Sequence, residues 1–317
     1  MDSPLRVGVS ACLLGQRVRW DGGHKSDAFL LGMLGRYVEW VPICPEVEVG
    51  LPVPRDTLRL VRRGAEVRMV MPRAGTDHTD AMKSYAARTA DELAARDLCG
   101  FVVKKDSPTC GMARVKVYPE NGGSPARDGR GLFAAALMAR MPDLPIEEEG
   151  RLSDARLREN FVERLFAYRR LKTLFAARWT LAGLVAFHSA HKLLLMAHSP
   201  AAYAALGRLV AGAKGQPREA LRARYESEFM AALSVLATPG RHANVLQHML
   251  GYVSPSLDAD QRAEIEELIV DYRHQLVPLL APLTLVRHHV RRLGVGYLLG
   301  QLYLEPNPKE LMLRNHA

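Results

Sequence analysis

The sequence predicts two domains of different class, an α/β domain with a largely parallel, Rossmann-like sheet followed by an all-α domain. Short apolar runs alternate with helical segments up to residue 141, the order of strands and helices in a parallel sheet. Residues 142–150 contain two prolines, three successive glutamates and a glycine, which is typical of a domain boundary. Beyond them the apolar period is helical throughout. We therefore expect an α/β domain over residues 1–145 and an all-α domain over residues 151–317.

Three apolar runs of the first domain are expected to be strands, and each stops at a cysteine or leads to one. Residues 7–12 (VGVSAC) and 39–44 (EWVPIC) are short β-rich runs that end in a thiol. Residues 101–103 (FVV) lead into the loop 104–111 (KKDSPTCG), where Ser-Pro and Cys-Gly indicate a tight turn. The sequence thus places three thiols in loops that follow strands.

The other elements of this domain follow from local composition. Residues 58–70 alternate apolar and charged side chains, the pattern of a hairpin with one solvated face. Residues 114–118 are a further alternating strand, and residues 121–131 are glycine-rich and expected to be irregular. Prolines at 45, 52 and 54 indicate a stiff loop without regular structure over residues 44–55. Segments rich in helix formers predict helices at residues 27–35, 79–97 and 132–141.

The second domain is expected to consist of helices separated by breaks that contain proline. The breaks are Ser199-Pro200, Gly215-Gln216-Pro217, Thr238-Pro239-Gly240 and Val253-Ser254-Pro255. The helices are predicted at residues 153–176, 180–198, 201–213, 218–236, 241–252, 258–277 and 282–293.

The composition is that of a globular protein, since 48% of the 317 residues are hydrophobic and 24% are charged. No run approaches the ~18 consecutive apolar residues of a membrane-spanning helix, and the N-terminus has no signal-peptide pattern. We therefore expect a cytoplasmic protein with no membrane partner. In a reducing compartment, four cysteines are more often metal ligands or catalytic groups than disulfides.

The net charge of +9 is unevenly distributed along the chain. Residues 1–150 contain 21 Lys and Arg against 20 Asp and Glu, net +1, whereas residues 151–317 contain 22 against 14, net +8. The second half also holds nine of the eleven histidines. A basic domain beside a neutral one fits a polyanion-binding module attached to a catalytic module. A solvated basic surface without a partner is the alternative.

Cys12, Cys44 and Cys110 are expected to converge, because the carboxyl ends of parallel strands lie at the same edge of a sheet. Their loops contain no fourth cysteine or histidine that would complete a four-ligand site. Such a set suits a [4Fe-4S] cluster with one iron open to substrate, or zinc with three sulfurs and a water, and thiolate ligation does not separate the two. Cys99 lies in the apolar lead-in to a strand and is expected to be a buried small hydrophobe.

Four blocks of the first domain resemble the thiouracil desulfidase family: VSACLLG at 9–15, DGGHK at 21–25, CPEVEVGLPVPR at 44–55 and KKDSPTCG at 104–111. Two later blocks, FHSAHKLLLMAHSP at 187–200 and RHANVLQHM at 241–249, resemble the helical domain fused to that family in bacterial tRNA 4-thiouridine desulfidases. The resemblance spans essentially the whole chain. It implies a [4Fe-4S] enzyme that replaces the sulfur of 4-thiouracil, or of 4-thiouridine in tRNA, with oxygen.

The resemblance also implies roles for individual residues. Cys12, Cys44 and Cys110 would hold the cluster, Glu46 would be the catalytic carboxylate, and Ser107 would be a hydroxyl that positions the substrate. A soft thiocarbonyl sulfur is expected to prefer an open iron site over the hard oxygen of the product. Glu48 is the rival of Glu46, because sequence spacing does not exclude it.

Further contacts are expected around these groups. Asp21, Gly22, Lys104 and Lys105 are candidates for the substrate pocket, and for the two lysines a solvated surface is the alternative. A helical projection of residues 180–198 places its three histidines and one lysine on one third of the helix. The RNA-contact candidates, for which metal binding or internal packing are alternatives, are His188, His191, Lys192, His198, Arg241, Asn244, His248, Arg287, Arg291 and Arg292.

The sequence is therefore compatible with three functions. The first is a desulfidase that acts on 4-thiouridine in tRNA, with the modified base extruded from its stack. The second is a desulfidase that takes only free thiouracil or thionucleotides. The third is a metal-sensing or redox-sensing RNA-binding protein without catalysis.

Overall fold

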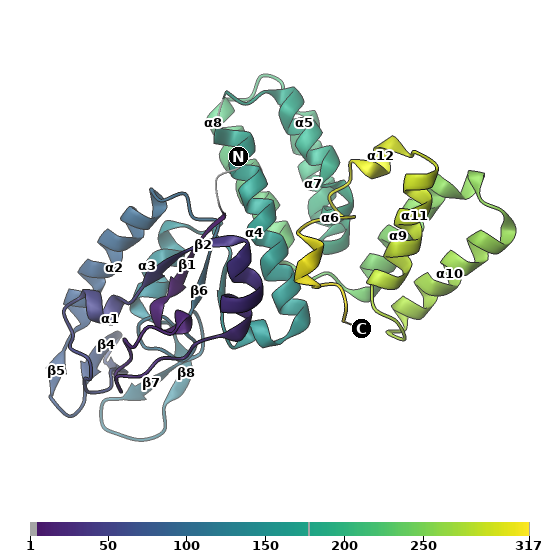
Figure 1. Cartoon of the computed structure of the whole chain (residues 1–317). Coiled ribbons are helices and arrows are strands. Elements are labelled where there is room, and N and C mark those ends of the chain that lie inside the picture. The colour runs from purple at the N-terminus through teal and green to yellow at the C-terminus, as the bar shows by residue number, and fades with distance from the viewer. Residues whose placement is uncertain (1–4, 177, 317) are drawn as a thin grey trace. The chain divides into compact units, whose positions relative to one another are not determined.

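The computed structural model describes residues 5–176 and 178–316 (Figure 1). The chain divides into two compact units after Ser153. The first unit contains the sheets, and the second consists of helices. This order of an α/β part followed by a helical part is the predicted fold class.

The first unit is built around a four-stranded parallel sheet in the order β2-β1-β6-β9. Val7 of the first strand pairs with Trp40 and Gly100 on either side, and Phe101 pairs with Ile146. Val7, Val9 and Phe101 are fully buried, as expected of parallel strands covered on both faces. The strands are β1 (Leu5–Ser10), β2 (Val38–Ile43), β6 (Gly100–Val103) and β9 (Ile146–Glu148).

The strand β9 lies in the segment that was interpreted as a linker, and beyond the expected end of the domain at residue 145. Its acidic residues Glu147 and Glu148, and Glu149 directly after it, are all buried. Each accepts hydrogen bonds from a partner elsewhere in the same unit, which offsets the cost of burying a carboxylate. The acidic run therefore completes the parallel sheet.

A second sheet of five strands has the order β5-β4-β3-β7-β8 and is mostly antiparallel, with only β3 and β7 parallel. The predicted hairpin is confirmed as β3 and β4. The strand expected at residues 114–118 joins this second sheet, and residues 121–131 contain a strand although we expected irregular structure. The strands are β3 (Arg59–Arg63), β4 (Glu66–Met71), β5 (Thr76–Asp77), β7 (Val115–Pro119) and β8 (Ala126–Gly129).

Two helices, α2 (Thr79–Ala94) and α3 (Leu132–Arg140), lie together against the parallel sheet (Figure 1). Phe133 of α3 packs on Tyr85 of α2 and on Phe101 of β6, with ring centroids 6.5 and 5.8 Å apart. Instead of the α-helix expected at residues 27–35, the chain forms a π-helical turn (Phe29–Met33) and a 3-10 turn (Leu34–Arg36).

The segment after β2 is also more regular than expected. Residues Pro45–Glu48 form the short helix α1, which begins directly after Cys44. Proline is compatible with this because it stands at the first helical position, where a missing N–H costs nothing. The prediction of an irregular loop over residues 44–55 was therefore wrong at its start.

The second unit is helical, as predicted, and packs around one core that includes Leu171, Tyr225, Phe229 and Leu246. The helix expected at residues 180–198 is divided at His191, whose backbone (φ −94°, ψ 2°) turns the chain between α5 and α6. Within the described ranges no helix has the length and apolar character needed to cross a membrane. The helices are α4 (Ala155–Ala176), α5 (Leu181–Ala190), α6 (Lys192–His198), α7 (Pro200–Ala211), α8 (Arg218–Ser234), α9 (Pro239–Val253), α10 (Ala259–Arg273), α11 (Leu280–Arg292) and α12 (Gly296–Leu299).

Candidate active site

Three cysteines line one cavity of about 380 Å³ at the carboxyl edge of the parallel sheet. Cys12 lies in the 3-10 turn (Ala11–Leu14) that follows β1, Cys44 directly follows β2, and Cys110 lies in the loop after β6. The order β2-β1-β6 places these three strand ends side by side. Residues far apart in sequence meet here because the strands that carry them are neighbours and parallel.

Burial raises the pKa of all three thiols. The pKa of Cys12 rises to about 11, with burial as the main cause and the neighbouring Cys44 as the second. The pKa of Cys44 is also raised, and that of Cys110, the most deeply buried, lies well above its usual value. Free thiols with these pKa values are protonated at neutral pH and are weak nucleophiles. A bound cation is what converts such thiols to thiolates.

The donor set fits an iron-sulfur cluster. Cysteine sulfur is a soft ligand that suits iron-sulfur clusters and zinc alike. Among the described residues, however, no three His, Cys, Asp or Glu side chains are close enough together to hold one metal ion. A four-iron cluster is larger than an ion and takes ligands that are farther apart. The three cysteine sulfurs that line the cavity are therefore a donor set that fits a cluster.

The loop that carries Cys110 is fixed from within by Ser107. Its Oγ accepts hydrogen bonds from the backbone N–H groups of Thr109 (3.2 Å) and Cys110 (3.0 Å). Gly131 donates its backbone N–H to the carbonyl oxygen of Gly111 (2.8 Å). A Cβ at Gly131 would lie 2.4 Å from the carbonyl oxygen of Thr109, so only glycine permits this approach. Ser107 lines the cavity and keeps its hydroxyl proton for another acceptor.

The last residue of β9, Glu148, and the following residue, Glu149, hold the two sides of the same loop. Glu149 forms a very short ion pair with Lys104 and accepts the backbone N–H of Lys105 (2.7 Å). Glu148 accepts the backbone N–H of Met112 (3.0 Å) on the far side of Cys110. The lysines both line the cavity, but Lys104 is neutralised by its partner, whereas Lys105 is exposed. Glu148 and Glu149, which the sequence places in a linker, therefore anchor the loop that carries Cys110.

Two carboxylates line the cavity, Glu46 and Asp106, and Asp106 is paired with Arg127 (3.2 Å). Oε2 of Glu46 accepts hydrogen bonds from Nε (3.0 Å) and Nη2 (2.5 Å) of Arg55, and its Oε1 accepts one from the hydroxyl of Thr109 (3.0 Å). The Arg55 side chain is only 2% exposed and also donates to the carbonyl oxygen of Val18 (2.9 Å). Glu46 is thus oriented by two partners while it lines the cavity.

Glu48 has a different environment, although it stands only two residues later. Its Oε1 accepts the backbone N–H of Cys44 (3.0 Å), and its Oε2 accepts the hydroxyl of Tyr85 (2.7 Å). It does not line the cavity. Glu48 therefore ties the start of α1 to α2, and Glu46 is the carboxylate in reach of a bound molecule.

Asp21 and Gly22 also lie outside the cavity lining, contrary to our expectation. Asp21 Oδ1 accepts the backbone N–H of Gly23 (3.0 Å), and Gly22 adopts a left-handed φ of +74°. Together they shape a turn that places Arg19 and Trp20 at the cavity instead.

Sequence reasoning missed Arg55 and Thr109 as partners of Glu46, and Arg19 and Trp20 as cavity residues. The signal that was available is Trp20, a large apolar side chain in a polar, glycine-rich stretch. Cys99, in contrast, is fully buried outside the cavity, as expected.

In the helical unit, three of the histidines expected to contact RNA are buried. His188 Nδ1 is 3.2 Å from the Tyr225 hydroxyl, His191 lies near Arg170, and His198 donates to Glu163. The helical projection was wrong because the chain turns at His191, so one continuous face does not exist. These side chains are packed in the core and are not accessible to a phosphate.

The other candidates of this unit lie nearer the surface. Lys192 lies over the ring of Tyr297, Arg241 donates to the carbonyl oxygen of His198 (2.7 Å), and His248 packs its edge against Tyr252. Asn244 and Arg292 are exposed. Arg287 and Arg291 both pair with Glu305 at 2.9 Å, so one carboxylate offsets only part of their charge.

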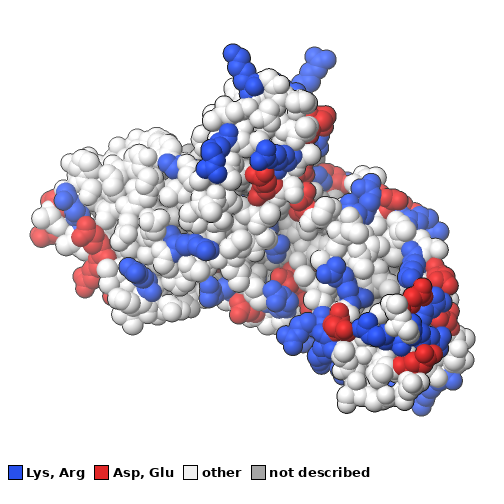
Figure 2. All heavy atoms as spheres, turned by 180° about the vertical axis from the view of Figure 1, so that it is seen from behind, with Lys and Arg blue, Asp and Glu red and all other residues white. Residues whose placement is uncertain are grey.

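The N-terminal unit has no comparable surplus of positive charge. Figure 2 shows blue and red side chains intermixed on the face of this unit that is seen from behind. Many are paired across the second sheet, for example Arg62 with Asp128 and Arg68 with Asp77. The +8 surplus calculated for residues 151–317 belongs to the helical unit.

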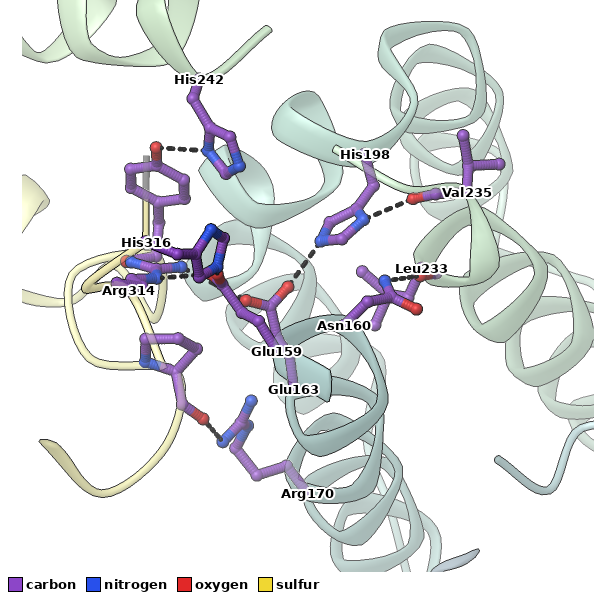
Figure 3. A network of polar contacts seen from close by, with 12 residues as sticks. Glu159, Asn160, Glu163, Arg170, His198, Leu233, Val235, His242, Arg314 and His316 are labelled. Carbon is purple, nitrogen blue, oxygen red and sulfur yellow. Dashed lines mark hydrogen bonds and ion pairs between the residues drawn. The ribbon is translucent and has the colours of Figure 1, made fainter. Parts of the chain in front are cut away.

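A network of buried ionisable side chains occupies the interior of the helical unit (Figure 3). Glu163 accepts from His198 (2.5 Å) on one oxygen and from Arg314 (3.2 Å) on the other. Glu159 accepts from Arg314 (3.1 Å) and from His316 (2.7 Å). The cavity beside them has a volume of only about 50 Å³. The network therefore fastens the segment with Arg314 to α4 rather than forming a pocket for an organic ligand.

Comparisons with known proteins agree with this division of the chain. Residues 7–149 match the family model "2-thiouracil desulfurase", and residues 192–308 match DUF1722, a family of unknown function. The first match includes all three cysteines, Glu46 and Ser107.

Two individual proteins are similar to parts of the chain. The uncharacterized protein YbgA of Escherichia coli K12 is 35% identical over 153 residues, which cover 48% of this chain and 90% of YbgA. The solved structure of the [4Fe-4S]-dependent thiouracil desulfidase TudS is 34% identical and covers 47% of this chain and 93% of its own, with a TM-score of 0.38.

Proposed function

The chain belongs to the thiouracil desulfidase family and carries a DUF1722 domain after its desulfidase domain in the sequence. We therefore propose that it removes sulfur from thiopyrimidines with a [4Fe-4S] cluster held by Cys12, Cys44 and Cys110. The observation that carries this proposal is the single cavity lined by these three thiols and by Glu46. The reaction is a replacement of the thiocarbonyl sulfur by the oxygen of water, so that one water is consumed and one sulfide leaves.

The cluster, when bound, would supply a soft iron site without a protein ligand, which attracts a thiocarbonyl sulfur in preference to a carbonyl oxygen. Glu46 takes the proton from the water that adds to the ring carbon and returns it to the departing sulfur. Arg55 and Thr109 keep this carboxylate in one orientation throughout. Ser107 donates its free hydroxyl proton to a ring oxygen or nitrogen and so orients the pyrimidine.

The test is an anaerobic purification followed by three measurements: the absorption spectrum, iron and sulfide content, and sulfide release from 4-thiouracil. We expect brown protein with about four irons per chain, the content of one such cluster, and uracil as the product. Colourless, iron-free protein with full activity would contradict the cluster. Iron-loaded protein that releases no sulfide from any thiopyrimidine would contradict the reaction.

Among the thiopyrimidines, we propose that the preferred substrate is 4-thiouridine in tRNA. The net charge of +8 over residues 151–317 supports this choice, since phosphate contacts dominate the affinity for nucleic acid. Lys105 supports it at the cavity, because no described carboxylate pairs with this exposed lysine. The aliphatic part of the Lys105 side chain packs against Gly150, where a Cβ would lie only 2.5 Å from Lys105 Cδ. This contact restricts the conformation of the side chain beside the cavity.

Turnover of tRNA and of free 4-thiouracil by the same preparation decides between the two desulfidase hypotheses. We expect a higher kcat/KM for tRNA, and we expect added salt to lower it for tRNA but not for the free base. Lys105→Ala should weaken tRNA turnover alone. Equal salt dependence for the two substrates would favour the free base, and binding of RNA without turnover would favour the sensor hypothesis.

A further inference from the structure

Trp20 is a large apolar side chain that remains 45% exposed at the cavity of the three cysteines. A single exposed apolar side chain is common on a protein surface, but an indole that lines a cavity offers a large flat face of the kind that is enriched at binding interfaces. The other exposed residues of the lining, Lys105 and Asp106, are charged. Trp20 is therefore the aromatic surface that this cavity offers to a planar molecule.

The turn that carries Trp20 has a defined conformation. Gly22 donates its backbone N–H to the carbonyl oxygen of Arg19 (3.0 Å), and Arg19 donates to that of Gly23 (3.3 Å). The left-handed φ of Gly22 and the hydrogen bond from Gly23 to Asp21 complete the turn. Asp21 and Gly22, which do not line the cavity themselves, thus determine where the indole stands.

The same turn is fastened to the Glu46 carboxylate. Arg55 donates its backbone N–H to the carbonyl oxygen of Trp20 (2.8 Å), and its side chain holds Glu46 at 2.5 and 3.0 Å. Arg55 therefore connects the backbone of Trp20 to the carboxylate of Glu46. A planar molecule on the Trp20 ring would lie in the same cavity as that carboxylate.

We propose that Trp20 is the platform on which the pyrimidine ring of the substrate stacks, and that it selects aromatic thiocarbonyl heterocycles over aliphatic thioamides. This inference rests on the proposed desulfidase function. A pyrimidine has a polarisable face that gains by stacking on an indole, whereas an aliphatic thioamide has a thiocarbonyl but no ring. Thiocarbonyl affinity for iron does not distinguish these two classes, so the distinction must come from a residue of the chain.

The experiment compares Trp20→Ala, Trp20→Phe and the matched control Trp40→Phe in iron-loaded protein. Trp40 lies on β2 and outside the cavity lining. For Trp20→Ala we expect KM for 4-thiouracil to rise about tenfold, equal to about 1.4 kcal/mol, with kcat and iron content within about threefold of the parent. Trp20→Phe should restore most of the affinity, because a phenyl ring still stacks. Trp40→Phe should have the same KM, kcat and iron content as the parent.

A binding measurement without turnover gives a second readout. The affinity for uracil, the product, is measured by calorimetry on the same proteins, and we expect it to fall about tenfold in Trp20→Ala. Turnover of thioacetamide, which has no ring, should be poor in the parent and unaffected by Trp20→Ala.

The outcomes separate the two proposals. Unchanged KM and unchanged uracil affinity in Trp20→Ala would overturn the role of Trp20 while leaving the desulfidase reaction intact. A parent protein that binds uracil through Trp20 but releases no sulfide from 4-thiouracil would overturn the reaction and support the stacking role. A parallel loss of iron and affinity that Trp20→Phe does not restore would show that Trp20 only supports the fold, and would also overturn the proposal.

Discussion

Glu46 and Glu48 lie on the same short helix, yet their carboxylates have different partners. Glu46 lines the cavity and is held by Arg55 and Thr109, whereas Glu48 accepts from the Cys44 backbone and from Tyr85. We therefore expect Glu46 to act in the reaction and Glu48 to stabilise the fold. Substitution of each glutamate by glutamine tests it, since glutamine keeps the size of the side chain and removes the basic oxygen.

For Glu46→Gln we expect a loss of kcat of about a hundredfold or more, the usual effect of removing a general acid or base, with iron content unchanged. For Glu48→Gln, the matched control, we expect activity within a few fold and a loss of stability of roughly 1 kcal/mol, because one hydrogen bond to a charged acceptor is weakened. Sulfide release and urea unfolding measure the two effects. A greater loss of kcat in Glu48→Gln would reverse the assignment.

A second prediction concerns the four cysteines. Cys110→Ser should lose most of its iron, because serine oxygen is a hard ligand that replaces a soft one. Cys99→Ser should keep its iron, since Cys99 lies outside the cavity and is buried in the lead-in to β6. Iron per chain after anaerobic reconstitution is the measurement. Equal iron content in the two variants would contradict the ligand set.

The convergence of the three cysteines was predicted from the strands that they follow, whereas Glu46 and Ser107 were proposed from the family resemblance, and all five residues line one cavity. Arg55 and Thr109 were not identified as partners of Glu46, because their contacts with it depend on the path of two separate loops. Lys104 and Lys105 were proposed as a pair, but only the distant Glu149 makes the two lysines different. Short sequence blocks thus indicated which residues line the cavity, but they did not indicate which side chains form hydrogen bonds or ion pairs with one another.

At the scale of elements, β9 shows how a buried acidic run can be mistaken for a linker. Glutamate side chains are usually solvated, so three in succession suggest a segment at the protein surface. Burial of these carboxylates is favourable only because other residues donate hydrogen bonds to them. Helix α1 was missed for a different reason, since proline blocks the interior of a helix but suits its first turn. The strands β1 and β6 were predicted correctly because continuous apolar runs identify strands buried on both faces, whereas β2, also predicted, lies at the sheet edge and is only partly buried.

Glu149 provides the prediction at this scale. In the iron-free protein, Glu149→Ala should lower the free energy of unfolding of the N-terminal unit by roughly 3 kcal/mol, because it leaves the mostly buried Lys104 without its partner. Glu120→Ala is the control, since the Arg63–Glu120 pair is about half exposed and such pairs contribute at most about 1 kcal/mol. Urea unfolding monitored by circular dichroism measures both. Equal effects would contradict an anchoring role of β9.

At the scale of the whole molecule, the two units are stabilised by different means. The first depends on parallel strands, glycine contacts and the ligand loop, and the second combines an apolar core with the buried network of Figure 3. The division into an α/β part and a basic helical part was visible in the sequence as a change of period and of charge. The burial of His188, His191 and His198 was not, because helical periodicity does not show where a helix turns.

The buried network predicts an acid sensitivity of the helical unit. Burial alone would raise the pKa of Glu163, but the charges of His198 and Arg314 outweigh it and lower this pKa to about 2. A carboxyl whose pKa is lower in the folded state stabilises the fold above its unfolded pKa, here 4.5. This contribution is lost as the pH falls from about 4.5 to about 2.

The measurement is the free energy of unfolding of the helical unit between pH 6 and pH 3. Glu163→Gln should be less stable than the parent at pH 6 by roughly 3 kcal/mol, since it leaves buried cations partly unpaired, and its stability should vary less below pH 4.5. Glu310→Gln, at an exposed position, is the control and should follow the parent. A variant with the same pH dependence as the parent would show that Glu163 does not titrate with folding.

The position of β9 at the end of its unit sets an order of events during synthesis. All three cysteines have left the ribosome before Glu148 and Glu149 emerge, and these two residues hold the loop of Cys110 from both sides. In a nascent chain, the three thiols are therefore present for some time before the residues that hold the Cys110 loop have emerged. For the proposed cluster, we therefore expect stable insertion of iron and sulfur only after residue 149 has been translated, so that synthesis of β9 and Glu149 sets the earliest time of assembly.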